Sequence, residues 1–226
     1  MRPSQDQIFF ASEGDKWFER NRQALEGFDP ERDIPLRLMA LHDLRPRNVL
    51  EVGAANGVRL AAINEKHSSR VVAVEPSVEA IAHGKARFPC VEFVRGTADA
   101  IPLQELFDLI IASYVFHWID RSSLLRAVAE IDRLLGDGGF LIIADFCPSN
   151  LTKVRYHHLL GEEVYTYKQN YAAPFLGSGM YQPICLLTGD HTTKTIKADV
   201  AEHERIGGWL LRKMLRGHYV EIPFHP

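Results

Sequence analysis

This chain of 226 residues has few cysteines, no excess of basic residues and no long apolar run. Its three cysteines, Cys90, Cys147 and Cys185, are odd in number and widely spaced, so they form no metal or redox motif and predict a reducing compartment. A net charge of −3 provides no basic field for nucleic acid. No apolar run approaches the ~18 residues of a membrane span. We therefore expect a cytoplasmic protein with neither a nucleic-acid nor a membrane partner.

Short, continuously apolar segments recur along the chain and alternate with helix-like segments. Apolar residues along a whole strand indicate burial on both faces, as in a parallel sheet. The alternation predicts a doubly wound α/β sheet. The expected strands are residues 48–52, 70–74, 91–94, 107–112, 140–144, 183–188 and 205–214, and the expected helices are 58–65, 77–87 and 121–135. The glycine-rich residues 136–139 are typical of a helix stop and turn.

The turn after the first expected strand is the most informative motif. Gly53 and Gly57 permit a tight turn and close approach of a ligand, which builds a nucleotide-shaped pocket at the carboxyl end of a strand. Glu51 would repel a pyrophosphate but attract an ammonium or a sulfonium. The segment Glu51-x-Gly53-x-Ala55-x-Gly57, with Asn56 in the same turn, resembles motif I of the class I S-adenosylmethionine-dependent methyltransferases. Ala55 stands where that family usually has its middle glycine.

This resemblance implies a Rossmann-like, mostly parallel sheet of seven strands that ends in an antiparallel hairpin, with N-terminal helices as a lid. The length suits a single domain, residues 1–226. Within it we assign 1–45 to the helical lid, 46–146 to the cofactor-binding core, 147–183 to a substrate-covering insertion and 184–226 to the C-terminal strands.

Further segments resemble the family's cofactor-binding motifs, in the family's order. Glu75, followed by Pro76, ends the second expected strand, where an acid can hold both ribose hydroxyls, and it follows the glycine turn at about the 20-residue spacing of a ribose-binding acid. Asp99 matches the family's adenine-binding acid, with Thr97 and Ala98 beside it. A solvated acid at a strand end and a loop aspartate that caps a turn are the structural alternatives for Glu75 and Asp99.

The fourth motif and the N-terminus complete the expected cofactor site. Ser113 ends the fourth expected strand, in a segment that resembles the family's motif IV, and the resemblance places it beside the sulfonium. Trp17 is expected to cover the methionine moiety and Arg20 to pair with its carboxylate, as in relatives. A helix that simply packs Trp17 onto the domain is the alternative.

Residues for the acceptor follow the fourth strand. His117 could act as a general base, orient a substrate oxygen, or pack in the core. The Phe-His-Trp sequence around it resembles small-acid carboxyl methyltransferases. Tyr114 and an aromatic segment in the insertion are expected to line the substrate pocket, with a packed insertion as the alternative. The segment contributes Tyr165, Tyr167, Lys168 and Tyr171, of which Lys168 could pair with an anion.

These observations predict an enzyme that transfers a methyl group from S-adenosylmethionine to an oxygen or nitrogen of a small molecule, such as a carboxylate, a natural product or a sugar intermediate. No metal is expected, because His157-His158 is not a metal motif and no acidic pair follows the fourth strand. Two alternatives stay open: a cofactor-binding regulatory partner of another methyltransferase, and an NAD-dependent oxidoreductase. A homodimer is also left open.

Overall fold

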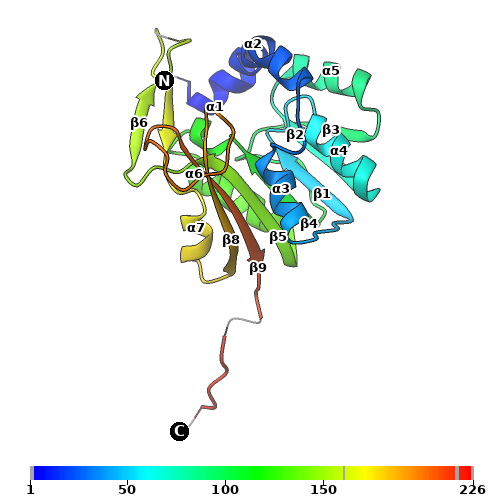
Figure 1. The fold of residues 1–226 in the computed structure, drawn as a ribbon, viewed down its shortest axis with the longest axis vertical. Coiled ribbons are helices and arrows are strands. Elements are labelled where there is room, and N and C mark those ends of the chain that lie inside the picture. Colours follow the sequence, from blue (N-terminus) through cyan, green and yellow to red (C-terminus); the bar gives the residue numbers. More distant parts are fainter. Residues whose placement is uncertain (1–2, 160, 217–218, 225–226) are drawn as a thin grey trace.

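A seven-stranded sheet is the centre of the computed structural model, which describes residues 3–159, 161–216 and 219–224 (Figure 1). Its strands are β1 (Asn48–Val52), β2 (Arg70–Glu75), β3 (Val91–Arg95), β4 (Phe107–Ser113), β5 (Leu135–Phe146), β8 (Tyr181–Asp190) and β9 (Arg205–Lys213). Their order is β3-β2-β1-β4-β5-β9-β8. Neighbours from β3 to β5 are parallel, whereas β9 is antiparallel to β5 and β8. The predicted mostly parallel sheet with its C-terminal antiparallel hairpin is confirmed.

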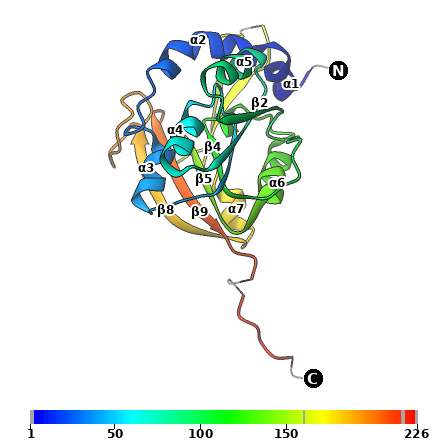
Figure 2. The same ribbon diagram turned by 90° about the vertical axis from the view of Figure 1, so that its right-hand side faces the viewer.

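Helices cover both faces of this sheet and create two apolar cores. They are α3 (Ile34–Leu41), α4 (Val58–His67), α5 (Val78–Arg87), α6 (Leu124–Leu134) and the short α7 (Ala173–Gly177). Side chains of α3 and α4 pack with one face, and those of α6 and α7 with the other. Figure 2 shows α3 and α4 on the opposite side of the strands from α6. Helix α3, which we had assigned to the lid, therefore contributes to the core.

The strand order reverses between β1 and β4, because the chain leaves β1 for β2 and β3 on one side and returns to β4 on the other. A crevice forms at such a point beyond the carboxyl ends of the strands. The N-terminal segments α1 (Gln5–Ile8), η1 (Phe9–Glu13, a π-helical turn) and α2 (Gly14–Glu26) contribute side chains to the pocket there. The fold thus places a covered pocket at the position that the glycine turn predicted.

The insertion forms a small second sheet of β6 (Thr152–Arg155) and β7 (Tyr165–Lys168), which pair antiparallel. Gln5 of α1 ties this sheet to η2 (Phe116–Trp118), the turn after β4. Its Nε2 donates to the carbonyl oxygens of Trp118 (2.6 Å) and Tyr165 (2.7 Å), and its Oε1 accepts from the amide of Tyr165 (2.9 Å). The buried amide of Gln5 therefore joins the N-terminal segments to the insertion.

The largest difference between an expected boundary and the structure is at the start of β5. Residues 136–139, expected to form a turn, lie inside β5, which begins at Leu135. Leu135 pairs with Phe107, and the register then shifts so that Phe140 pairs with Leu109. The extra residues of β5 lie at this irregularity, so the glycines belong to a bulged strand.

In the described part of the chain, no helix combines the length and apolarity needed to cross a membrane.

Close packing of α3 on the C-terminal hairpin generates a stability prediction. A Cβ added at Gly208 would lie 2.3 Å from Cγ2 of Ile34. Gly208→Ala should therefore push α3 away from β9 and lower the free energy of unfolding by about 1–3 kcal/mol. Gly177→Ala is the matched control, because a Cβ there meets nothing within 4 Å. Urea unfolding of both variants measures the difference; equal midpoints would contradict the close contact.

Candidate active site

The turn between β1 and α4 depends on backbone with positive φ. Gly53, Ala55 and Gly57 have φ of 70°, 48° and 74°. A Cβ on Gly53 would lie 2.3 Å from Cγ2 of Val115, so this position excludes every other residue in the present packing. Ala55 occupies the left-handed region, which costs an L-residue roughly 1–2 kcal/mol. The middle position of the motif thus keeps a glycine-like conformation without a glycine.

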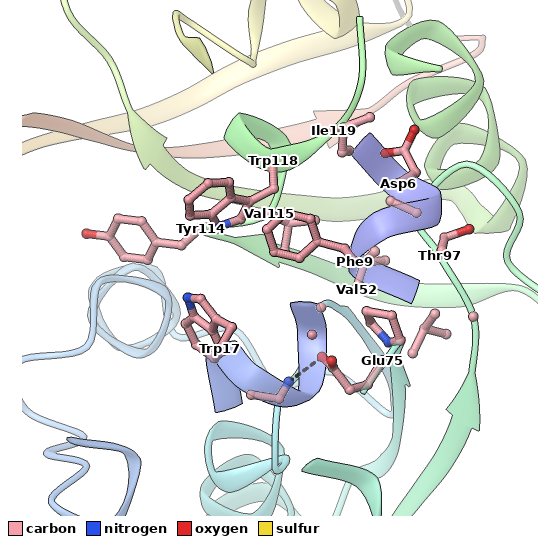
Figure 3. Close-up of a pocket in the computed structure, with 17 residues that line it drawn as sticks. Asp6, Phe9, Trp17, Val52, Glu75, Thr97, Tyr114, Val115, Trp118 and Ile119 are labelled. Atoms are coloured by element: carbon pink, nitrogen blue, oxygen red, sulfur yellow. Dashed lines mark hydrogen bonds between the residues drawn. The ribbon is translucent and has the colours of Figure 1, made fainter. Parts of the chain in front are cut away.

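A first chamber of about 110 Å³ opens beyond this turn, at the carboxyl ends of β1 and β2 (Figure 3). Its lining includes Gly53, Ala55 and Glu75, together with Phe9 and Trp118, whose ring centroids are 5.1 Å apart. The remaining lining residues are Asp6, Gly14, Trp17, Val52, Val74, Pro76, Gly96, Thr97, Ala98, Tyr114, Val115 and Ile119.

Glu75 is the acid of the first chamber. Its Oε2 accepts from the amide of Ala55 (2.8 Å, dashed in Figure 3) and its Oε1 from the amide of Ser77 (2.9 Å). Burial raises the pKa of this carboxyl to about 7, although both amide hydrogen bonds oppose that shift. Each oxygen retains a lone pair, so the carboxylate can still accept hydrogen bonds from two hydroxyls of a ligand.

A second, larger chamber of about 550 Å³ adjoins the first. Both are lined by Trp17, Gly53, Ala55, Tyr114 and Trp118. Four more predicted residues line only the second chamber: Glu51, Ser113, His117 and Lys168. The two chambers are therefore consecutive parts of one crevice, which separates the expected ribose acid from the expected acceptor residues.

A buried ion cluster forms one wall of the second chamber. Arg59, at the start of α4, pairs with Glu51 and donates to Asp33 (2.8 Å) and to Oγ of Ser113 (3.2 Å). Burial is the main reason why the pKa of Glu51 is raised to about 7. The guanidinium of Arg59 lowers this pKa, whereas the neighbouring carboxyl of Asp33 raises it. Oε2 of Glu51 has no hydrogen-bond partner among the described residues. A donor group of a ligand in this chamber could satisfy that oxygen.

His117 and Asp145 form a buried pair at the base of the second chamber. Nδ1 of His117 lies 2.8 Å from Oδ1 of Asp145, and the carboxyl also accepts from the amides of His117 (3.3 Å) and Phe146 (2.7 Å). A carboxylate only accepts, so Nδ1 carries the proton and the Nε2 of the neutral ring is left as an acceptor. Nε2 has no hydrogen-bond partner in the described part of the chain. This arrangement is that of an oriented general base.

Several predicted site residues lie outside the lining of both chambers. Arg20 pairs with Glu13 and donates to the hydroxyl of Tyr156 (2.6 Å). Asp99 accepts from Arg126 (3.0 Å) and from Oγ1 of Thr97 (2.8 Å). Both charged groups already have partners within the protein.

The other predicted residues outside the chambers have packing or turn positions. Asn56 accepts from the amide of Val58 (3.3 Å) at the start of α4, next to Gly57. Tyr171 is buried and stacks on Phe116, with ring centroids 5.2 Å apart. Tyr165 and Tyr167 lie on β7, where Lys153 and Arg121 cover their rings.

The structure adds residues that the sequence analysis did not identify. Asp145 ends β5, and an acid at the carboxyl end of a buried strand is the same signal that identified Glu75. Arg59 follows the glycine turn by two residues, so its place at the helix start was a usable signal. His191 and Lys194, in the β8–β9 connection, carried no local signal. No group of three metal-ligating side chains occurs among the described residues.

Comparison with known sequences identifies a family for the middle of the chain. Residues 49–139 match the family described as "Methyltransferase domain". An uncharacterised methyltransferase of Alkaliphilus oremlandii is 31% identical over 106 residues, which cover 47% of this chain and 49% of that protein. A ubiquinone/menaquinone biosynthesis C-methyltransferase of Campylobacter jejuni is 25% identical over 49% of each chain. The match thus spans about half the length of these relatives.

Solved structures with the same fold cover nearly the whole chain. The 1,6-didemethyltoxoflavin-N1-methyltransferase of Burkholderia thailandensis, with its substrate and S-adenosylhomocysteine bound, superposes with a TM-score of 0.72 at 18% identity, over 95% of this chain and 92% of that one. An N-methyltransferase of Bradyrhizobium japonicum bound to S-adenosylhomocysteine gives 0.59 at 17% identity, over 93% and 99%. Likeness at these identities establishes the fold.

Burial of Glu75 predicts a pH dependence for binding of S-adenosylhomocysteine, the ligand of those two structures. Hydroxyl donors favour the ionised carboxyl, whose pKa is about 7 in the free protein. Affinity should therefore fall as pH decreases through 7. Glu75→Gln should weaken binding at pH 8 at least tenfold, since hydrogen bonds to charged groups contribute about 1.5–3 kcal/mol each, and should flatten the profile between pH 6 and 8.

Isothermal titration calorimetry across that pH range measures both effects. The melting temperature of each free protein is the control for folding. An unchanged dissociation constant in a folded Glu75→Gln variant would remove Glu75 from the ligand site.

Proposed function

Since this chain contains a class I S-adenosylmethionine-dependent methyltransferase domain, we propose that it transfers a methyl group from S-adenosylmethionine to an oxygen or nitrogen atom of a small molecule. One observation carries the proposal: an oriented base, His117, lines a chamber that continues from the glycine turn and Glu75. The family match supports the donor, and the His117–Asp145 pair supports an acceptor that must lose a proton.

The residues of the crevice fit the donor. Glu75 would accept hydrogen bonds from the ribose hydroxyls, and Thr97 and Ala98 would border the adenine. Gly53 would border the ligand, because it lines both chambers, while the unpartnered oxygen of Glu51 would accept from the amino group of the methionine part. Bound there, S-adenosylmethionine supplies a methyl group activated by its sulfonium. The partners of Arg20 and Asp99 within the protein leave them without a role in this proposal.

The protein's own contribution is positioning and proton transfer. Trp118 and Tyr156 pack with ring centroids 4.6 Å apart above the second chamber, which limits the access of water to the acceptor. Asp145 holds the ring of His117 so that Nε2 can take the acceptor proton. In-line displacement then depends mainly on holding the acceptor in place. An NAD-dependent reaction is disfavoured, since the carboxyl of Glu51 lies at the turn where a pyrophosphate would bind.

The choice of cofactor is directly testable. S-adenosylhomocysteine at 100 times its dissociation constant should stabilise the folded protein by about 2.7 kcal/mol, which corresponds to roughly 5–10 °C in melting temperature for a domain of this size. NAD at the same concentration should produce no shift. A shift with NAD alone would replace the proposal with an oxidoreductase.

Catalysis by His117 is tested with an acceptor found by screening for S-adenosylhomocysteine release. His117→Ala should lower kcat about 10²–10⁴-fold, the usual contribution of a general base. Asp145→Asn should lower kcat at least tenfold, because the ring of His117 loses the carboxylate that orients it. His67→Ala, on the exposed end of α4, is the control.

Both active-site variants should bind S-adenosylhomocysteine within about twofold of the parent. Normal turnover by a folded His117→Ala variant would leave positioning alone as the catalytic device. Cofactor binding without turnover on any acceptor would favour the regulatory alternative.

A further inference from the structure

The aromatic rings of Tyr114 and Phe146 line the second chamber next to His117. The rings of Tyr114 and Phe146 meet edge to face, with centroids 6.0 Å apart. His117 lies 5.2 Å from the ring centroid of Phe146 and 6.3 Å from that of Tyr114. Tyr114 has a φ of 56°, an uncommon conformation for a bulky residue that marks a position held by its surroundings. A ligand that contacts these rings in the second chamber is next to the candidate base.

Two ammonium groups lie over the same rings. Nζ of Lys168, from β7, is 3.8 Å from the ring centroid of Phe146. Nζ of Lys194, from the β8–β9 connection, is 5.2 Å from that of Tyr114. Among the described residues neither ammonium forms an ion pair with a carboxylate: Lys168 donates to the carbonyl oxygen of His203 (2.8 Å), and Lys194 lies 3.4 Å from Nδ1 of His191.

The charges that line the chamber are unbalanced. Among the described residues, Glu51 is the one carboxyl in the lining, and it pairs with Arg59, which also pairs with Asp33. Lys168 and Lys194 add positive charge to the same lining. Three carboxyls act on these lysines from outside the lining: Glu204 accepts from Thr192, Asp190 pairs with Lys197, and Asp145 pairs with His117. A chamber with this excess attracts an anion.

The two ammonium groups in this lining are partly buried. Burial lowers the pKa of Lys168 and of Lys194, because both ammonium groups lose part of their hydration. The neighbouring His191 has its pKa lowered to about 4, chiefly by burial, so it stays neutral and adds no further charge. An anionic ligand between the two lysines would restore the favourable interactions that burial removed.

Resting on the proposed function, we infer that the methyl acceptor is a small organic anion that binds in the second chamber beside Tyr114 and Phe146. Its carboxylate or other negative group pairs with Lys168 and Lys194, and a separate O–H or N–H group faces His117. The acceptor proton passes to Nε2 of His117, the freed electron pair forms the bond to the methyl carbon, and the carbon–sulfur bond of the donor breaks to leave S-adenosylhomocysteine. The negative group is a handle and is not methylated.

The test compares isosteric probes that differ in charge. Benzoate and 4-hydroxybenzoate are titrated against the protein saturated with S-adenosylhomocysteine, alongside benzamide and 4-hydroxybenzamide, at low and high salt. We expect each carboxylate to bind at least tenfold more tightly than its amide, with a preference that weakens as salt increases. The double variant Lys168→Gln/Lys194→Gln should lose this preference while its affinity for the amides is unchanged.

Lys85→Gln, an exposed lysine of α5, is the control for the loss of positive charge and should keep the preference. Equal binding of carboxylates and amides, binding of neither, or an unchanged preference in the double variant would each overturn the inference. Saturation with S-adenosylhomocysteine separates this result from the proposed function: failure to bind that ligand rejects the methyltransferase proposal, whereas its binding without charge preference rejects the anion alone. Methylation of the carboxylate itself, detected as an ester by mass spectrometry, would also overturn it.

Discussion

One buried guanidinium holds the crevice together. Arg59 of α4 contacts Glu51 of β1, Ser113 of β4 and Asp33, which caps α3. It therefore joins the two strands that flank the switch point to a helix on the sheet's face. Removing one member of a buried ion pair typically costs 3–5 kcal/mol, because the remaining charge is left uncompensated. The walls of both chambers depend on this contact, since the glycine turn leads directly from Glu51 to Arg59.

The two chambers differ in chemistry and in origin. The first is built from the turn and from the ends of β1 and β2, within the segment that matches the methyltransferase family. The second takes Phe146, Lys168 and Lys194 from beyond residue 139, outside that match. The family match therefore includes the glycine turn, Glu75 and His117, but not the two lysines of the second chamber.

How much the sequence predicts depends on how local the signal is. Buried strands and the turn at Gly53 have local causes, namely continuous apolar runs and positive φ, and their positions were predicted correctly. Glu75 carried a local signal, an acid at the carboxyl end of a buried strand, although one of its hydrogen bonds comes from Ala55, 20 residues earlier. Asp99 pairs with Arg126, 27 residues away on α6, and Arg20 pairs with Tyr156, 136 residues away. Such pairs depend on tertiary packing, so a position in a motif could not show that these charges were already satisfied.

Gln5 joins the N-terminal helices to the insertion beside the crevice. Its side-chain amide bonds at once to η2 and to β7, and it is only 3% exposed. If the N-terminal helices moved alone, the buried carbonyls of Trp118 and Tyr165 would lose their donor, and each unsatisfied group costs about 1–3 kcal/mol. Movement of the N-terminal segments alone would carry this cost, whereas movement together with η2 and β7 would keep the hydrogen bonds of Gln5. The two chambers would then open to solvent together, although they are built from distant parts of the chain.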